Sequence, residues 1–161
     1  MARKRTLTVS VIIVSLVLAA FFIAQRAQHV DTTAATAAGA EYFTHLEKGR
    51  VADAMLIYRE SFRQQQGENW PRFLEGLAAK YGPVTDSALD GWQIVPIDGV
   101  GCVLLNYRIS RGALRSQENL ILCPKAADAK FAIVGHEMTR HDTQQKVSAG
   151  ITAISKGISI P

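Results

Sequence analysis

The chain has 161 residues, enough for one domain of ordinary size, because folding units cluster near roughly 100 to 200 residues. This length excludes a large multidomain enzyme. Hydrophobic residues make up 48% and charged residues 20%, a balance typical of a globular chain. The formal net charge of +4 comes from 18 Lys and Arg against 14 Asp and Glu, but three of the basic residues stand at positions 3–5. A nucleic-acid binder carries its basic charge on the folded domain, so nucleic acid is not an expected partner.

The amino-terminal region contains one long apolar run. Residues 7–24 read LTVSVIIVSLVLAAFFIA and carry no charge, and a helix of that length rises roughly 27 Å, close to the thickness of bilayer hydrocarbon. The basic residues before the run predict that residues 1–6 lie in the cytoplasm and that the chain after the run lies across the membrane. The predicted membrane-embedded side chains include Leu7, Val11, Val14, Leu18, Phe21 and Phe22.

We expect this segment to be an uncleaved anchor in the inner membrane of a bacterium. A tether over residues 25–37 and a periplasmic domain would follow it. The alternative is a cleaved signal peptide and a secreted protein. Cleaved signals usually have an apolar core of only about 7 to 15 residues before an Ala-x-Ala-like site. Here the run is longer, and the candidate sites at residues 18–20 and 25–27 have poor residues at the third position back.

Three helices are predicted after the tether. In the first, which begins near residue 38, apolar residues recur at helical spacing until Gly49, which is placed to end the helix. The second is predicted over Val51–Phe62. The third is predicted over residues 69–81, with Asn69 as its N-cap and a proline in its first turn.

After residue 83 the pattern changes to that of strands. They are predicted over residues 89–95, 100–110, 115–123 and 130–138. Gly112 and Ala113 can occupy the centre of a tight hairpin turn. Helices followed by an antiparallel meander predict an α+β domain in which the helices cover one face of a curved sheet of about four strands.

The hairpin turn sets the two cysteines opposite each other. With the turn centred between Gly112 and Ala113, Cys102 faces Cys123. Directly opposed residues of a non-hydrogen-bonded antiparallel pair have Cα atoms about 4.5 Å apart, within the reach of a disulfide. We therefore predict a structural disulfide, which suits an oxidising compartment. The alternatives are two buried free thiols or a catalytic or metal-binding pair, although the Cys-x-x-Cys spacing of many such pairs is absent.

A family resemblance rests on four phrases, AEYFTHLEKGRVADAM, RFLEGLAAKYGPV, GCVLLNYRISRGALRSQENLIL and FAIVGHEM. With the order of elements, they resemble the small cone-shaped α+β domains of the cystatin-like or nuclear-transport-factor-two-like superfamily, over about residues 38–139. The resemblance is greatest to bacterial envelope members of undefined function. Members of this superfamily include enzymes, ligand binders and scaffolds, so function must be argued from a site.

The resemblance also implies where a catalytic or ligand site would lie. Enzymes of this superfamily place an acid or base and a Tyr in the concavity between helices and sheet. The implied cavity residues here are Tyr58, Tyr81, Tyr107 and Glu118, and the hairpin register sets Tyr107 opposite Glu118. The alternative for Tyr107 is an amphipathic side chain at the sheet rim, hydrogen-bonded to a neighbour. No pair of these groups has a diagnostic catalytic spacing, so no catalytic residue is predicted.

The histidines and tryptophans are expected to have ordinary structural roles. His136 and His141 stand five residues apart, whereas a zinc-protease helix needs a spacing of four. We therefore expect His136 to be a surface or rim residue, and we expect no metal and no cofactor. Trp70 and Trp92 are expected to pack at the start of the third helix and on the first strand.

The carboxyl-terminal tail, residues 140–161, has the pattern of an amphipathic helix. Residues 142–145 read as a capping box. Val147, Ile151, Ile154 and Ile158 follow on one helical face. Such a stripe either packs back on the domain or docks on a partner or a second copy of the chain.

The sequence thus predicts a non-catalytic, single-pass inner-membrane protein whose periplasmic domain is a binding or assembly module for an envelope complex. Its expected partner is another protein or a second copy. One alternative is a small-ligand binder or isomerase-type enzyme that uses the cone cavity, and another is the secreted form.

Overall fold

The computed structural model describes residues 30–125 and 130–151. Within these ranges it is an α+β fold of four helices and one five-stranded antiparallel sheet, so the predicted class is confirmed. The helices are α2 (Thr32–Glu47), α3 (Val51–Met55), α4 (Glu60–Gln66) and α5 (Asn69–Tyr81). The strands are β1 (Asp86–Ile97), β2 (Val100–Arg111), β3 (Leu114–Pro124), β4 (Phe131–Arg140) and β5 (Lys146–Gly150).

Two predicted features fall outside the described residues. They are the membrane segment over residues 7–24 and the last part of the tail, with Ile154 and Ile158. Among the helices of the described ranges, none is long and apolar enough to cross a membrane.

The first and last helices have well-defined ends. Asp31 caps α2, since its carboxylate accepts a hydrogen bond of 2.9 Å from the backbone N–H of Ala34. This helix therefore begins at Thr32, and residues 32–37, expected in the tether, are helical. The range predicted for the last helix matches α5, although its N-cap position falls on Glu68 and not on Asn69.

The predicted second helix is wrong in its middle, because it is two short helices with an extended link. In the link, Tyr58 forms a parallel bridge with Ile133 of β4. The backbone N–H of Arg59 donates to the carbonyl of Ile133 at 2.9 Å, and the N–H of Ile133 donates to the carbonyl of Ile57 at 3.1 Å. These bonds satisfy backbone polar groups of β4 on the side that faces away from β3. If the link continued as a helix, it could not make these bonds.

The hairpin between β2 and β3 has the predicted register. Arg111 pairs with Leu114 around the turn, and Tyr107 pairs with Glu118. The sulfur atoms of Cys102 and Cys123 lie 2.01 Å apart, with their Cα atoms 4.4 Å apart, so the two cysteines form the predicted disulfide.

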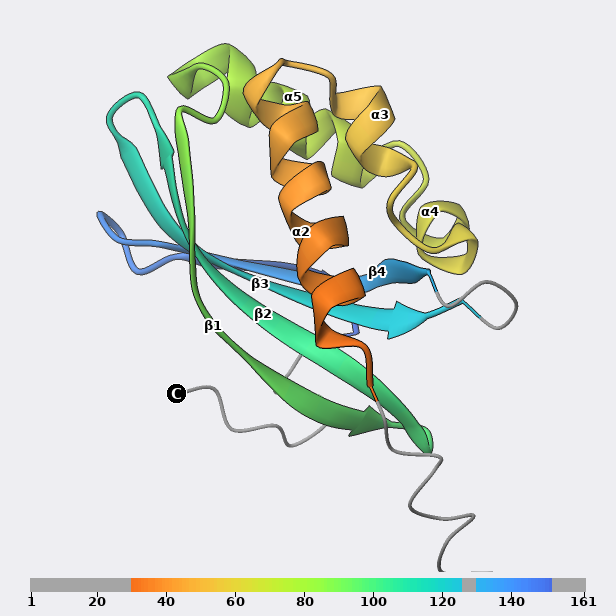
Figure 1. Cartoon of the computed structure of the whole chain (residues 1–161). Coiled ribbons are helices and arrows are strands. Elements are labelled where there is room, and N and C mark those ends of the chain that lie inside the picture. The colour runs from red at the N-terminus through yellow and green to blue at the C-terminus, as the bar shows by residue number, and fades with distance from the viewer. Residues whose placement is uncertain (1–29, 126–129, 152–161) are drawn as a thin grey trace, which may run out of the picture. The chain divides into compact units, whose positions relative to one another are not determined.

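All four helices lie over one face of the sheet, which runs in the order β1-β2-β3-β4-β5 (Figure 1). Helix α2 approaches the sheet closely at Gly39, where an added Cβ would lie 2.6 Å from the Leu105 side chain. The core between the layers contains the largest fully buried side chains, Tyr42, Phe43, Tyr58, Leu105, Leu120 and Ile133 among them. On the opposite face of the sheet, a second cluster of Val95, Ile97, Cys102, Leu104, Ile121, Cys123 and Val134 is also buried.

The predicted carboxyl-terminal helix is wrong over its first residues. Residues 146–150 form strand β5, in which Val147 pairs with Met138 of β4. Ile151 follows the strand and packs against the cluster on the face opposite the helices. The expected capping box instead contributes a turn, in which Asp142 forms an ion pair with Arg140.

Candidate functional site

Five polar side chains meet under the helices, and we call them the Glu118 cluster: Tyr58, Arg111, Ser116, Glu118 and His136. Arg111 ends β2, Ser116 and Glu118 lie on β3, and His136 lies on β4. Alternation along the strands turns these four toward the helices. Tyr58 reaches them from the link between α3 and α4.

The hydrogen bonds of the cluster form a chain that starts at the carboxylate. Glu118 Oε1 accepts from Arg111 Nη1 and, at 3.1 Å, from Ser116 Oγ. Glu118 Oε2 lies 3.0 Å from His136 Nε2, and His136 Nδ1 lies 2.8 Å from the Tyr58 hydroxyl. A carboxylate only accepts, so in a neutral imidazole the proton sits on Nε2 and Nδ1 accepts from Tyr58. The Tyr58 oxygen also accepts from Trp70 Nε1 at 2.9 Å.

The charges of the cluster are strongly coupled. Burial alone would raise the pKa of Glu118, but the charge of Arg111 and the hydrogen bonds from His136 and Arg111 outweigh it and lower the pKa to about 2. Burial raises the pKa of Tyr58 well above its usual range, so this hydroxyl stays protonated. Glu118 is therefore an anion held between a guanidinium and an imidazole.

The cluster is sealed inside the domain. Glu118 is 0% exposed, and Tyr58 and His136 are 1% exposed each. A catalytic base must come within hydrogen-bond distance of its substrate, either directly or through one water. We interpret the cluster as a buried polar core that joins β2, β3, β4 and the α3–α4 link. Each of its side chains is hydrogen-bonded, although Arg111 Nη2 has no partner among the described residues.

The implied cavity residues separate into different contacts. Tyr58 and Glu118 belong to the same cluster, but they do not contact each other directly and are connected by hydrogen bonds through His136. Tyr107 pairs with Glu118 in the sheet, yet its ring packs against Phe43 with the ring centres 4.5 Å apart, and burial raises its pKa to about 12. Tyr81 ends α5 and packs against a smaller cluster that includes Met138. The four residues thus do not line one common cavity among the described residues.

Sequence reasoning missed His136 and Arg111 as members of this cluster. His136, expected at the surface or rim, is buried opposite Leu120 in the middle of β4. For His136 the signal lies in the register of β4 against β3, which contains a bulge between Ile121 and Leu122 and does not follow from the sequence. Arg111 gave no signal, because an arginine that ends a strand is usually solvated.

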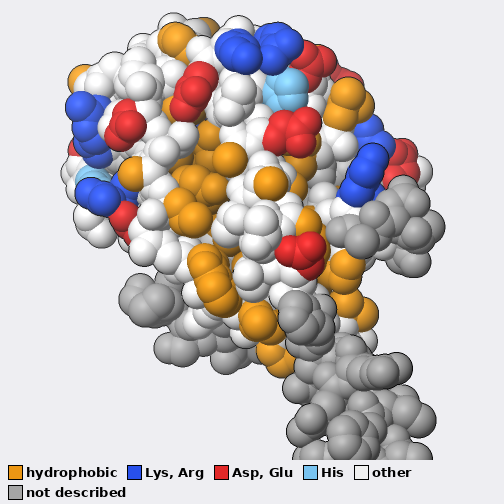
Figure 2. Space-filling view, in the orientation of Figure 1, with side chains coloured by type: hydrophobic (Ala, Val, Ile, Leu, Met, Phe, Trp, Pro, Cys, Tyr) orange, Lys and Arg blue, Asp and Glu red, His pale blue; other side chains and the backbone are white. Residues whose placement is uncertain are grey.

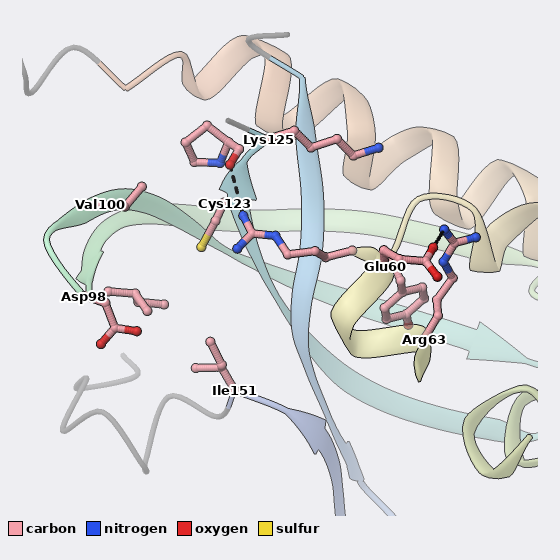
Figure 3. A pocket seen from close by; sticks show the side chains of 11 residues that line it. Glu60, Arg63, Asp98, Val100, Cys123, Lys125 and Ile151 are labelled. Carbon is pink, nitrogen blue, oxygen red and sulfur yellow. Dashed lines mark hydrogen bonds and ion pairs between the residues drawn. The ribbon is translucent and has the colours of Figure 1, made fainter. Parts of the chain in front are cut away.

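A surface pocket of about 820 Å³ lies where the β1–β2 turn, the end of β3 and the α3–α4 link meet (Figure 3). We call it the Arg59 pocket. Arg59 lies on its wall and donates through Nη2 to the Pro124 carbonyl at 3.0 Å. Arg63 and Glu60 form an ion pair beside it. Its remaining lining residues are Tyr58, Ile97, Asp98, Val100, Cys123, Lys125 and Ile151.

The second surface feature is the outer edge of β1, to which no other strand of the described sheet pairs. Leu89, Trp92 and Ile94 lie along it with 40%, 50% and 49% of their surfaces exposed, and we call these residues the β1 strip. Hydrophobic side chains gather over β1 on its side toward α2 (Figure 2). The prediction that both tryptophans pack is confirmed for Trp70, which is 4% exposed, and wrong for Trp92.

Comparisons with protein-family models, curated proteins and solved structures found no match to this chain. The cystatin-like resemblance therefore stays a prediction. Within residues 30–125 and 130–151, no group of three or more His, Cys, Asp or Glu side chains is placed to hold a metal ion.

Proposed function

We propose that this protein is a non-catalytic assembly module that self-associates through the outer edge of β1. In this proposal residues 7–24 anchor it in the inner membrane of a bacterium, with its α+β domain in the periplasm. The uncharged run behind three basic residues supports the anchor, and the cysteine pair at disulfide distance suits a periplasmic domain. Helices packed on one face of an antiparallel sheet support the proposed kinship with cystatin-like domains.

The observation that carries the proposal is the apolar, unpaired edge of β1. Edge strands expose backbone N–H and C=O groups, and proteins usually protect them with charges, prolines or bulges. This strand has a bulge between Leu89 and Gly91 and a proline at 96. The stretch between them, residues 91–95, carries no charge, and two residues of the β1 strip stand on it.

The hairpin geometry decides which backbone groups face outward. Ile97 and Val100 flank the two-residue turn and form a hydrogen-bonded pair, so the alternate pairs at Val95 and Gln93 are bonded to β2 as well. Trp92 and Ile94 therefore point their backbone N–H and C=O groups away from β2. These are the groups that another strand would bind.

A second copy of this chain is the occupant that fits the edge. Two β1 strands paired antiparallel about the midpoint of the open stretch are related by a two-fold axis at Gln93. Trp92 of each copy then faces Ile94 of the other, twice, with backbone bonds between them. An apolar pair of this kind stabilises a sheet by roughly 0.2 to 1 kcal/mol beyond the backbone bonds. The contact is thus self-complementary in both side chains and backbone.

Cysteine crosslinking tests this pairing. In it the two Gln93 residues form a non-hydrogen-bonded pair with Cα atoms about 4.5 Å apart, a disulfide distance. The full-length Gln93→Cys variant in native membranes, treated with a mild oxidant, should give a covalent dimer on a non-reducing gel. Two control variants should remain monomers: Asp86→Cys on the same strand, and Gln65→Cys, which is exposed on α4.

Two outcomes would overturn self-association. One is the absence of the Gln93→Cys dimer in a membrane fraction where the protein keeps its native disulfide. The other is equal dimer formation by all three variants, which would report random collision. Loss of the dimer when Trp92→Ser is added to Gln93→Cys would tie the contact to the β1 strip.

A further inference from the structure

We infer that the Arg59 pocket binds an anionic amphiphile, a long-chain fatty carboxylate, in addition to the proposed self-association. The pocket lies at the other end of β1 from its bulge and is built from segments far apart in the chain. Its volume of about 820 Å³ lies within the range of about 300 to 1,000 Å³ common for ligand sites.

The cationic side of the pocket has an unused charge. Arg59 is half-buried, and among the described residues its guanidinium donates one hydrogen bond, to the uncharged Pro124 carbonyl. Neither Arg59 nor Lys125 forms an ion pair with any residue in the described part of the chain. Arg63, by contrast, is paired with Glu60. A half-buried guanidinium with free N–H groups favours a carboxylate, which it can bind through charge-assisted hydrogen bonds.

Most of the remaining lining residues are apolar, and Asp98 is the charged exception. Figure 3 shows Cys123 and Ile151 directed into the hollow from opposite sides, with Val100 at its far end. Val100 is 45% exposed. Ile97 and Pro124 complete this wall. An alkyl chain laid along these side chains would remove their apolar surface from water, which favours binding.

The two sides together select the ligand class. A neutral lipid would leave the Arg59 guanidinium without an acceptor, and a small hydrophilic anion would leave the apolar wall in water. A carboxylate head near Arg59 and Lys125 with its chain toward Val100 and Ile151 satisfies both.

Photocrosslinking of the full-length protein in native membranes tests this site. The probe is hexadecanoic acid with a diazirine in mid-chain, and labelled peptides are mapped by mass spectrometry. Labelling is expected on the peptides that contain Val100 and Ile151. Arg59→Gln should lower it by about tenfold, because charge-assisted hydrogen bonds are lost. Arg72→Gln, an exposed arginine of α5, is the matched control and should leave labelling unchanged.

A second probe and a second variant test the proposal further. The alcohol with the same chain and diazirine should label these peptides about tenfold less than the acid. Val100→Asp should also lower labelling, because it puts a carboxylate in the path of the chain without changing Arg59. Equal labelling by acid and alcohol, an equal loss in Arg72→Gln, or labelling confined to residues 7–24 would each overturn the inference.

Discussion

The substitution Glu118→Gln should make stability much less dependent on acid. In the unfolded chain the carboxyl titrates near 4.5, and in the fold its pKa is about 2. Since the folded pKa is the lower one, the charge contributes stability above pH 4.5 that is lost as the pH falls toward 2. At roughly 1.4 kcal/mol for each pKa unit, this contribution is about 3 kcal/mol. The substitution also leaves Arg111 buried without a counter-charge, which costs roughly 3 to 5 kcal/mol at neutral pH.

Urea unfolding of the full chain in a mild non-ionic detergent, followed by circular dichroism at about pH 7, 5, 4 and 3, measures this difference. The gap between wild type and Glu118→Gln should narrow by about 2 kcal/mol between pH 7 and pH 3, because the rest of the contribution is lost only at still lower pH. Glu75→Gln, at an exposed position on α5, should follow wild type throughout. If Glu118→Gln does not fold, Ser116→Ala removes one hydrogen bond to Glu118 and should cost about 1 kcal/mol. A gap that stays constant across this pH range would refute the assigned ion pair.

Two further predictions concern other parts of the fold. Replacing Cys102 and Cys123 together by Ala opens a loop with a sequence separation of 21 and should lower the free energy of unfolding by about 3 kcal/mol relative to oxidised wild type. Reduced wild type is the control and should unfold with the same free energy as the double variant. In α2, Gly39→Ala places a Cβ 2.6 Å from Leu105 and should cost about 1 to 3 kcal/mol. The control is Gly76→Ala in α5, where the added Cβ meets nothing within 4 Å and should raise the free energy of unfolding by up to about 1 kcal/mol. If Gly39→Ala and Gly76→Ala shift the melting temperature equally, the close packing of α2 on the sheet is contradicted.

Local sequence was sufficient for the hairpin and the disulfide. A tight turn at Gly112 fixes every partner along β2 and β3, because strand pairing has a period of two and cannot slip without exposing one whole buried face. The position of Cys102 opposite Cys123 follows from that turn alone. The α+β class is just as local, since helical spacing and strand runs occupy separate parts of the chain.

The candidate site was far less predictable. Tyr58 and Glu118 were named as cavity residues, but their connection through His136 depends on how β4 registers against β3, and that register contains a bulge between Ile121 and Leu122. The exposure of Trp92 was hidden for a related reason. A tryptophan on a strand with alternating burial is expected to pack, and only the sheet order shows that β1 is an edge strand of the described sheet, on which Trp92 is 50% exposed.

The two incorrect helix predictions have one common cause, the outer edge of β4. The first half of that edge pairs with residues 57–59, inside the predicted second helix. From Gly135 onward it pairs with β5, inside the predicted carboxyl-terminal helix. The partners change where Gly135 faces Gly150, and an added Cβ on Gly135 would lie 1.6 Å from the Ile151 carbonyl oxygen. Both segments carry apolar residues at helical spacing, yet the backbone groups of a central strand need partners more than a short helix needs its own bonds. Helical periodicity is a property of the local sequence and carries no information about the hydrogen bonds that a distant strand requires. It therefore predicts the wrong structure for the two segments that pair with β4.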